Sequence, residues 1–457
     1  MRGAWSTLAL VAVALGLGAY IYFVDSARSD TEANEKVFAV EPGTVEEVRV
    51  VAKGDTSVLM KTGADWALAE PLVTDADSNT VGALLNSLTS LEVVREVDPK
   101  ATDLAQYGLA EPKADITFSG TSGAAGRLRL GDSSPSGTDM YAIKGDDARV
   151  FLVNISVENS LVKSAFELRD KRVLRFARDQ ADGVEITTSA GTVALTRADS
   201  EWRLGAPSGA RGDYGAIEGL LTRLSTTMMS AIETTDLATL KKYGLDPPVA
   251  TVAVKAGSAT ATLAVGATAD GKTFARDLAR PMVFAVDPAF ATDLQKDASE
   301  YRRKEVFDLR AFSATQIALT RGADTVTFRK KAGAGENPAD TWTVTGPGAT
   351  AAREASAGLM EEALTKLSGL RARAFEAAAP AGTTPVMIVR AEYEENKKEE
   401  ASFGRAGDDI VVVRPDEGGA MRLDVAAVED VLKAFDAVLA PPAPATPPAA
   451  ASPEKNP

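Results

Sequence analysis

The chain repeats a long pattern of its own residues. Nine residues recur without a gap at a constant offset of 136 positions, as from Trp66 to Trp202. In the first copy they are Trp66, Pro71, Asp77, Leu84, Leu85, Leu88, Tyr107, Gly108 and Leu109, and in the second Trp202, Pro207, Asp213, Leu220, Leu221, Leu224, Tyr243, Gly244 and Leu245. Solenoid repeats have periods of about 20–50 residues, so each copy here is long enough to form a small domain with its own core.

A third, weaker copy follows the second. Trp342 and Pro347 repeat the spacing of Trp66 and Pro71, but the Tyr-Gly-Leu element is missing. The later hydrophobic residues Met360, Leu364 and Leu367 are aligned with Leu84, Leu88 and Leu91 of the first copy. The sequence therefore predicts tandem modules, an organisation that more often serves binding or spacing than catalysis.

Residues 5–24 carry no charge. At 1.5 Å of rise per residue, twenty such residues form a helix of about 30 Å, the thickness of a bilayer core. A cleaved signal peptide is the alternative, but its apolar region is usually shorter and ends in small residues. Arg2 precedes the segment, and acidic residues dominate just after it. The positive-inside rule then predicts a retained single span, with the N-terminus in the cytoplasm and all later residues outside.

The composition excludes several kinds of chemistry. A net charge of -14 argues against nucleic-acid binding. Cysteine and histidine are both absent, which removes disulfides, thiolate or imidazole metal sites, and Ser-His-Asp and Cys-His catalysis. The sequence thus identifies no catalytic residue, no cofactor and no metal ligand.

Each module is expected to be α+β and mostly antiparallel. Short runs rich in valine, leucine and aromatics at 45–51, 57–61 and 66–69 are typical of strands separated by tight turns. Asp77 then precedes leucines at helical spacing, which predicts a capped amphipathic helix whose leucine stripe is buried on the sheet. The short loops between the later strands favour antiparallel pairing.

These patterns divide the chain into five parts. We expect a membrane anchor at 1–30, a first module at 40–176, a second at 180–310, a divergent third at 311–439 and a disordered Pro/Ala-rich tail at 440–457. The charge-rich segment Glu167–Val173 has a counterpart at Glu300–Val306, and each is expected at a junction between modules.

The chain resembles a known bacterial family, domain of unknown function 4340. The resemblance rests on the N-terminal anchor, the W-x-L-x-x-P segments at 66–71 and 202–207, the helix that follows each, and the Y-G-L-x-x-P signatures at 107–112 and 243–248. Members of this family are membrane-anchored and often encoded beside ABC-type transporters of the gliding-motility kind. The resemblance implies the bacterial inner membrane, extracytoplasmic modules and a possible transporter or envelope partner, but no catalytic residues.

One motif points to a different function. Residues 266–273, GATADGKT, fit the P-loop pattern G-x-x-x-x-G-K-[ST], in which backbone N–H groups and the lysine hold phosphates. A P-loop must open a helix, whereas Pro281 ends the following segment after barely two turns. The aligned segment of the first copy, 131–138, has no lysine and is typical of a turn between strands. We therefore expect a hairpin turn and a chance match.

The remaining prominent residues have local explanations. Trp66, Trp202 and Trp342 are expected to be packing anchors rather than ligand platforms. Gly108 and Gly244 are expected to adopt left-handed geometry at helix ends, which also accounts for Tyr107 and Tyr243. The structural anchors of the repeat are then Trp66, Trp202, Trp342, Pro71, Pro207, Tyr107, Tyr243, Gly108 and Gly244.

The sequence favours a membrane-anchored extracytoplasmic binding or scaffold protein, accessory to an ABC-type transporter or surface-assembly system. The bilayer is contacted through residues 5–24. Two enzyme alternatives stay open: a cell-envelope hydrolase that uses carboxylates, and the P-loop NTPase. A carboxylate enzyme would require a cleft that holds two acids, whereas a scaffold would show filled cores and an exposed groove between modules.

Overall fold

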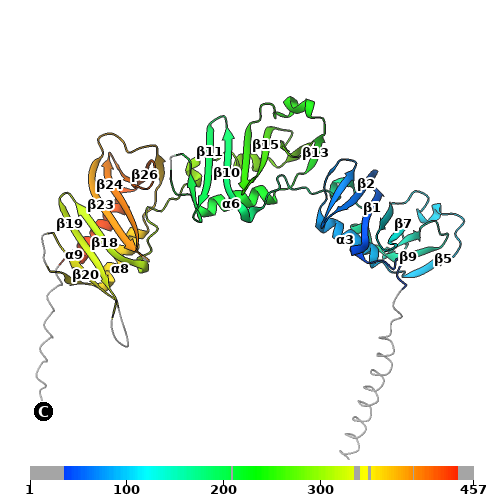
Figure 1. Ribbon diagram of the computed structural model, residues 1–457, viewed down its shortest axis with the longest axis horizontal. Helices are drawn as coiled ribbons and strands as arrows, with labels where there is room; N and C mark the ends of the chain where they lie inside the picture. The colour runs from blue at the N-terminus through cyan, green and yellow to red at the C-terminus, as the bar shows by residue number, and fades with distance from the viewer. Residues whose placement is uncertain (1–34, 207–208, 334–339, 348–350, 395, 441–457) are drawn as a thin grey trace, which may run out of the picture. The chain divides into compact units, whose positions relative to one another are not determined.

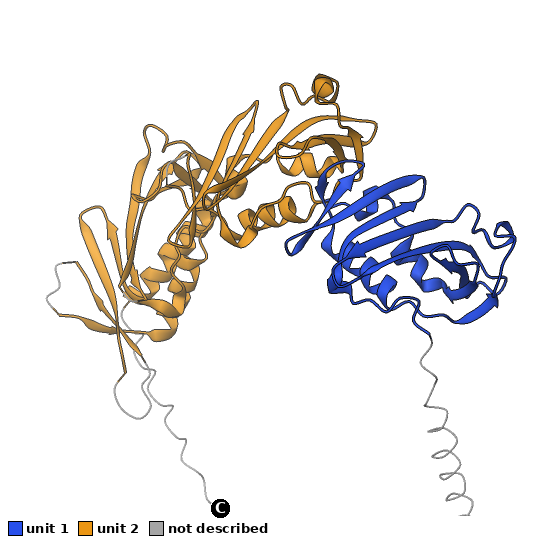
Figure 2. Cartoon of the chain, turned by 45° about the vertical axis from the view of Figure 1, so that its right-hand side comes forward, with its two compact units in different colours: residues 1–171 blue, residues 172–457 orange. Residues whose placement is uncertain are grey.

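The structure is a computed structural model that describes residues 35–206, 209–333, 340–347, 351–394 and 396–440. The predicted membrane segment at 5–24 and the tail after 440 lie outside these residues. The chain divides into two compact units, residues 1–171 and 172–457 (Figure 2). The first unit holds one antiparallel sheet and the second holds two (Figure 1). The expectation of tandem, mostly antiparallel α+β modules is therefore confirmed.

The sheet of the first module has nine strands. In spatial order they are β4 (Thr74–Asp75), β3 (Asp65–Glu70), β2 (Asp55–Thr62), β1 (Val45–Ala52), β6 (Ala114–Gly120), β7 (Ala125–Ser133), β8 (Asp139–Lys144), β9 (Val150–Asn154) and β5 (Arg95–Asp98).

The sheet of the second module has eight strands. In spatial order they are β12 (Glu201–Leu204), β11 (Gly191–Ala198), β10 (Ala181–Thr188), β14 (Ala250–Ala256), β15 (Ala259–Ala269), β16 (Lys272–Asp277), β17 (Val283–Val286) and β13 (Ala231–Thr234). A single bridge between Arg203 and Arg211 stands where the first module has β4.

The sheet of the third module again has nine strands. In spatial order they are β21 (Arg353–Ala355), β20 (Thr341–Thr345), β19 (Asp324–Lys331), β18 (Ala314–Arg321), β23 (Thr384–Tyr393), β24 (Lys397–Ala406), β25 (Asp409–Val413), β26 (Ala420–Leu423) and β22 (Ala374–Glu376). Its strand order matches that of the first module position by position, so the third module has the same topology despite its weak sequence similarity.

Each module has an equivalent amphipathic helix that follows its first strands. These helices are α3 (Ser78–Thr89), α6 (Tyr214–Thr226) and α8 (Ala357–Ser368). The carboxylate of Asp77 accepts a hydrogen bond from the N–H of Thr80 at 2.7 Å, and Asp213 does the same for Ala216 at 2.7 Å. The predicted caps are thus confirmed, and they satisfy N–H groups that the first turn leaves without an intrahelical partner.

The buried faces of these helices follow their sequence spacing. In α3, Val81, Leu84 and Leu88 are buried in the same core as the inward side chains of the central strands. The third module corrects one detail of the sequence alignment. Met360 follows its N-cap Ser356 as Val81 follows Asp77, so Met360 is equivalent to Val81 and not to Leu84. The chain between Trp342 and α8 is therefore longer than in the first module.

Each sheet is followed by a second helical segment, again with a side-chain cap. These segments are a 3₁₀ turn (Ile155–Val157) with α4 (Glu158–Leu161) and α5 (Ala165–Leu168) in the first module, α7 (Pro288–Asp293) in the second and α9 (Val425–Leu439) in the third. Asn154, Asp287 and Asp424 accept the capping hydrogen bonds. In the first module this segment is broken, because α4 ends at Leu161 and α5 begins at Ala165. Within the described residues, no helix is both long and apolar enough to cross a membrane.

Candidate functional site

The three repeated tryptophans lie at equivalent places in their modules. Trp66 is in β3, Trp202 in β12 and Trp342 in β20. Their exposed fractions are 9%, 2% and 6%. Trp66 and Trp342 belong to the main cores of their modules. Near Trp202 the packing is so close that a Cβ atom built on Gly212, just before α6, would stand 2.8 Å from the Trp202 Cβ atom. These side chains contribute buried surface and are not displayed on a groove.

The Tyr-Gly-Leu elements end short 3₁₀ helices, Ala105–Tyr107 (η3) and Leu237–Tyr243 (η6). Gly108 and Gly244 have φ angles of 67° and 65°, so both occupy the left-handed region as expected. Tyr107 packs on Tyr141 with ring centroids 5.0 Å apart, and Tyr243 packs on Phe274 at 4.9 Å. Pro71 lies directly after β3, whereas Pro207 lies outside the described residues.

The Tyr-Gly-Leu element packs on the face of its sheet that is opposite to the main core. In the first module Leu109 clusters with Ile143 and Val150, whereas their neighbours Ala142 and Phe151 belong to the main core. Successive residues of a strand point to opposite faces. The Tyr-Gly-Leu element therefore forms a small apolar cluster on the face away from α3, which gives it a structural role that its sequence did not reveal.

The P-loop-like segment forms the predicted hairpin. Strand β15 runs through the first half of the motif, Asp270 and Gly271 turn with φ angles of 52° and 72°, and β16 begins at Lys272. The Nζ atom of Lys272 lies 3.1 Å from a carboxylate oxygen of Glu233. No helix follows the motif, so the backbone N–H groups belong to a strand pair and not to a phosphate cradle.

The most unusual arrangement of charge joins the second and third modules within the second unit. Its five ionisable side chains are each no more than 4% exposed. They are Arg211, Arg302, Glu399, Arg414 and Glu417, and we refer to them as the joint. Arg211 precedes α6, Arg302 lies in the linker, Glu399 lies in β24, and the other two lie in the β25–β26 turn.

Arg211 is the second module's largest contribution to the joint. Its guanidinium group contacts Glu417 through Nε, lies 2.7 Å from Asp308 and lies 3.7 Å from Glu399. Its Nη2 atom also donates to the carbonyl oxygen of Glu305 at 2.9 Å. One arginine of the second module therefore binds both the linker and two acids of the third module.

Arg414 completes the network from the third module. It lies 3.1 Å from Glu399 and 3.2 Å from Glu417, and it donates to the carbonyl oxygen of Val306 at 2.7 Å. The carboxylate of Glu399 accepts hydrogen bonds from the backbone N–H groups of Asp308 at 3.0 Å and Leu309 at 3.2 Å. Buried charges are tolerated only when they are paired and hydrogen-bonded, and both conditions hold for Arg414 and Glu399.

Arg302 connects the linker to the same turn. It lies 3.5 Å from Glu417 and donates to the carbonyl oxygen of Gly418 at 3.0 Å. Its guanidinium group also lies 4.5 Å from the ring centroid of Phe375. Burial lowers the pKa of Arg302, and the charge of Glu417 opposes that effect. Nearby, burial and then the charge of Glu399 raise the pKa of the Tyr393 phenol above its usual range.

The second module holds its incoming linker with a loop in the same topological place. Arg280, between β16 and β17, donates from Nη2 to the carbonyl oxygens of Arg172 and Val173, each at 2.7 Å. Arg414, between β25 and β26, does the same for Val306. The second and third modules therefore each fix the segment that leads into them by an arginine from the loop before their last strand along the chain.

The joint attaches the third module to the second. Its acids are each bound by guanidinium groups, which leaves neither as a free general acid or base. Among the described residues, no group of three or more acidic side chains is arranged to hold a metal ion. The repeated charge-rich segments of the sequence predicted a junction between modules here. They did not predict which residues form the joint, because the partners of these residues are distant in the chain: Arg211, Glu399, Arg414 and Glu417.

The fold and the joint define a class of protein built from tandem α+β modules. The family described as domain of unknown function (DUF4340) matches the chain over residues 66–236 and again over 202–386. The two matches begin at the equivalent residues Trp66 and Trp202 and together span well over half of the chain, so the chain belongs to this family. Comparisons with curated proteins and with solved structures found no match.

Proposed function

We propose that this protein is a membrane-anchored extracytoplasmic scaffold that presents its modules to a partner, and that it accompanies an ABC-type transporter or a surface-assembly system. Residues 5–24 are the proposed anchor, in the bacterial inner membrane with the N-terminus in the cytoplasm. The uncharged length of that segment and the acidic residues after it support this topology.

The joint is the observation that carries the proposal. A buried network between modules is costly to assemble unless every charge is paired, and its effect is to hold two copies of one fold as a single unit. A protein that only needed three independent binding domains would not require this. A fixed spacing between two similar surfaces suits a partner that has two contact points, such as a membrane complex.

The two enzyme alternatives have less support. A carboxylate-dependent envelope hydrolase needs a pair of acids facing a cleft. The buried acids Glu399 and Glu417 are bound by arginines. Asp293 and Glu300 line a pocket beside α6, but the carboxylate of Asp293 is bound by Arg223 and Lys296. A P-loop NTPase needs a helix after the motif, whereas Lys272 begins a strand. The scaffold proposal requires no active site.

Photo-cross-linking in the living cell tests the proposal. The side chain of Phe312, in a 3₁₀ turn (Ala311–Ser313) before β18, is 72% exposed and is the first position for a photoreactive amino acid. Asp270, at the tip of the β15–β16 hairpin, is a second position on a different module. We expect cross-links to an integral membrane protein, identified by mass spectrometry after detergent extraction, and weaker cross-linking when Arg211→Ala loosens the joint.

Two outcomes would contradict the proposal. One is a mature N-terminus near Ala27 or Arg28 with the protein recovered in the soluble fraction, because the span would then have been cleaved. The other is the absence of any membrane-protein cross-link from either module. Hydrolysis of an envelope polymer by the purified full-length chain would favour the carboxylate enzyme instead.

A further inference from the structure

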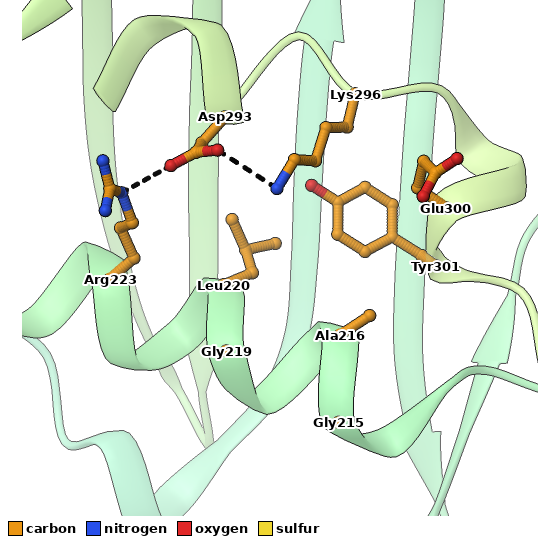
Figure 3. Close-up of a pocket in the computed structure, with 9 residues that line it drawn as sticks. All are labelled: Gly215, Ala216, Gly219, Leu220, Arg223, Asp293, Lys296, Glu300 and Tyr301. Atoms are coloured by element: carbon orange, nitrogen blue, oxygen red, sulfur yellow. Dashed lines mark ion pairs between the residues drawn. The ribbon is translucent and has the colours of Figure 1, made fainter. Parts of the chain in front are cut away.

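The second module contains a pocket beside its helix α6. The cavity measures about 330 Å³ and lies between α6 and the segment after α7 (Figure 3). Its floor is formed by Gly215, Gly219 and Leu220 of α6, and its opposite side by Lys296 and Tyr301. A volume of this size is at the lower end of small-molecule sites, so any occupant is small.

Small residues on α6 create the space. Counted from the N-caps Asp213, Asp77 and Ser356, Gly219 is equivalent to Ala83 in the first module and to Glu362 in the third. A Cβ atom built on Gly219 would meet no heavy atom within 4 Å. The helix face is thus open at this point, and a larger side chain at position 219 would extend into the pocket.

Tyr301 provides the second and independent observation. Its carbonyl oxygen accepts a hydrogen bond from the N–H of Asp213 at 2.8 Å, as that of Leu168 does from Asp77 at 2.9 Å, so the two residues are equivalent. Leu168 is part of an apolar core. Tyr301 is 2% exposed and lines the pocket, but its hydroxyl has no hydrogen-bond partner. A buried hydroxyl without a partner costs free energy, which a bound ligand would recover.

The charged groups around the pocket leave donors available. A carboxylate oxygen of Asp293 lies 2.7 Å from Nε of Arg223, and the other lies 3.1 Å from Nζ of Lys296. Lys296 therefore keeps two of its three N–H bonds for another acceptor. Burial, followed by the charges of Asp293 and Glu300, raises the pKa of Tyr301 to about 12. The hydroxyl thus keeps its proton at neutral pH and is a donor.

We propose that this pocket binds a short-chain carboxylate, whose oxygens accept hydrogen bonds from the Tyr301 hydroxyl and the Lys296 ammonium group. The apolar part of the ligand lies on Gly219 and Leu220. Lys296 is about half exposed, so its long side chain can move to admit the ligand and then close over it. None of the residues that line the pocket belongs to the joint, so the site does not depend on the proposed scaffold function.

Calorimetric titration of the full-length chain in detergent tests the site. The probes are sodium acetate, butyrate and hexanoate at constant ionic strength, with butyramide as the uncharged equivalent of butyrate. We expect saturable binding of at least one carboxylate and none of butyramide. Tyr301→Phe removes only the hydroxyl, and because hydrogen bonds to charged groups are strong, it should weaken binding at least about tenfold.

Two glycine substitutions separate filling of the pocket from a general effect on a helix. Gly219→Leu should abolish binding because its side chain occupies the cavity. Gly82→Leu is the control, since Gly82 lies in α3 of the first module and a Cβ atom there also meets nothing within 4 Å. Heats equal to those of sodium chloride for all three carboxylates would overturn the proposal. So would equal affinity of the wild type, Tyr301→Phe and Gly219→Leu.

Discussion

The carbonyl oxygen of Tyr243 lies 2.2 Å from the point where a Cβ atom on Gly266 would stand. Only glycine at position 266 therefore lets the Tyr-Gly-Leu element pack this closely on β15. Tyr107 and Gly131 have the same relationship in the first module, again at 2.2 Å. Gly266 is also the first glycine of the P-loop-like motif. Its presence follows from this packing, and the second glycine, Gly271, follows from the left-handed turn.

Gly266→Ala should therefore destabilise the second module. The added methyl group meets backbone that cannot move without displacing the Tyr-Gly-Leu element, and overpacking of this kind typically costs about 1–3 kcal/mol. Urea unfolding of the full-length chain measures the effect. Gly82→Ala in α3 is the matched control and should be neutral or slightly stabilising, because its Cβ atom points into open space. Equal stability of the two variants would refute the packing argument.

Lys272→Ala should change little. The ion pair with Glu233 is on the surface, with the lysine side chain 47% exposed, and such pairs contribute about 0–1 kcal/mol. Neither the wild type nor the variant should bind Mg-ATP in equilibrium dialysis. Binding by the wild type that is lost in the variant would show that the hairpin holds phosphate after all.

The tryptophans should act locally. Truncation of a buried tryptophan typically costs about 3–5 kcal/mol, so Trp66→Ala should destabilise the first unit and leave the second nearly unchanged. Trp202→Ala and Trp342→Ala should both lower the stability of the second unit, since the joint couples those modules. Hydrogen exchange followed by mass spectrometry resolves the two units. Stable variants that lose cross-linking to a partner would instead indicate a binding role for these side chains.

Arg211→Ala should be among the most damaging single substitutions in the chain. The substitution removes one of the arginines that pair with the buried carboxylate of Glu417. Removal of one partner of a buried ion pair typically lowers the free energy of unfolding by about 3–5 kcal/mol. Arg178→Ala is a suitable control because its ion pair with Glu218 lies at the surface. Chemical unfolding compares the two. A small effect at both positions would mean that water or a rearranged side chain compensates at the joint.

The first unit should show a specific acid sensitivity through Glu167. Burial opposes its ionisation, but Lys53 at 2.8 Å and the backbone N–H of Ser164 lower the pKa of this carboxyl from 4.5 to about 2. Because the folded pKa is depressed, the ionised group stabilises the fold above about pH 4.5, and this contribution is lost as the pH falls toward 2. Glu167→Gln should therefore be less stable than the wild type at pH 7, and the difference should shrink below pH 4.5. Urea unfolding across this range measures it, and a constant difference would contradict the assignment.

The sequence predicted features whose causes are local. Asp77 and Asp213 stand directly before helical leucine patterns, and Gly108 and Gly244 stand where helices end, so capping chemistry within a few residues was enough to place them. The strands could also be predicted, because the alternation of apolar and polar residues reflects which face of the sheet is buried. The edge strand β5 was missed: Arg95–Asp98 is polar and pairs only on one side, so it carries no alternating apolar signal.

Features that depend on distant partners could not be predicted. Arg211 and Glu417 are 206 positions apart, and neither stands in a recognisable motif. The pocket beside α6 was missed for the same reason, since Tyr301 is equivalent to Leu168 only through its backbone contact with the helix start. The predicted equivalence of Met360 with Leu84 was wrong because it was counted from Trp342. The helix begins after its N-cap Ser356, and counting from that residue makes Met360 equivalent to Val81.

The place of Arg280 and Arg414 in their modules has a consequence for how such chains lengthen. Each arginine lies in the loop before the last strand of its module along the chain and binds backbone carbonyl oxygen of the segment that enters that module. A tandem gene duplication of one repeat length copies the entering segment together with the arginine that fastens it. A duplicated module would thus already contain part of the contact that fixes it to the preceding module. Chains with different numbers of modules can therefore evolve without a new contact at each junction.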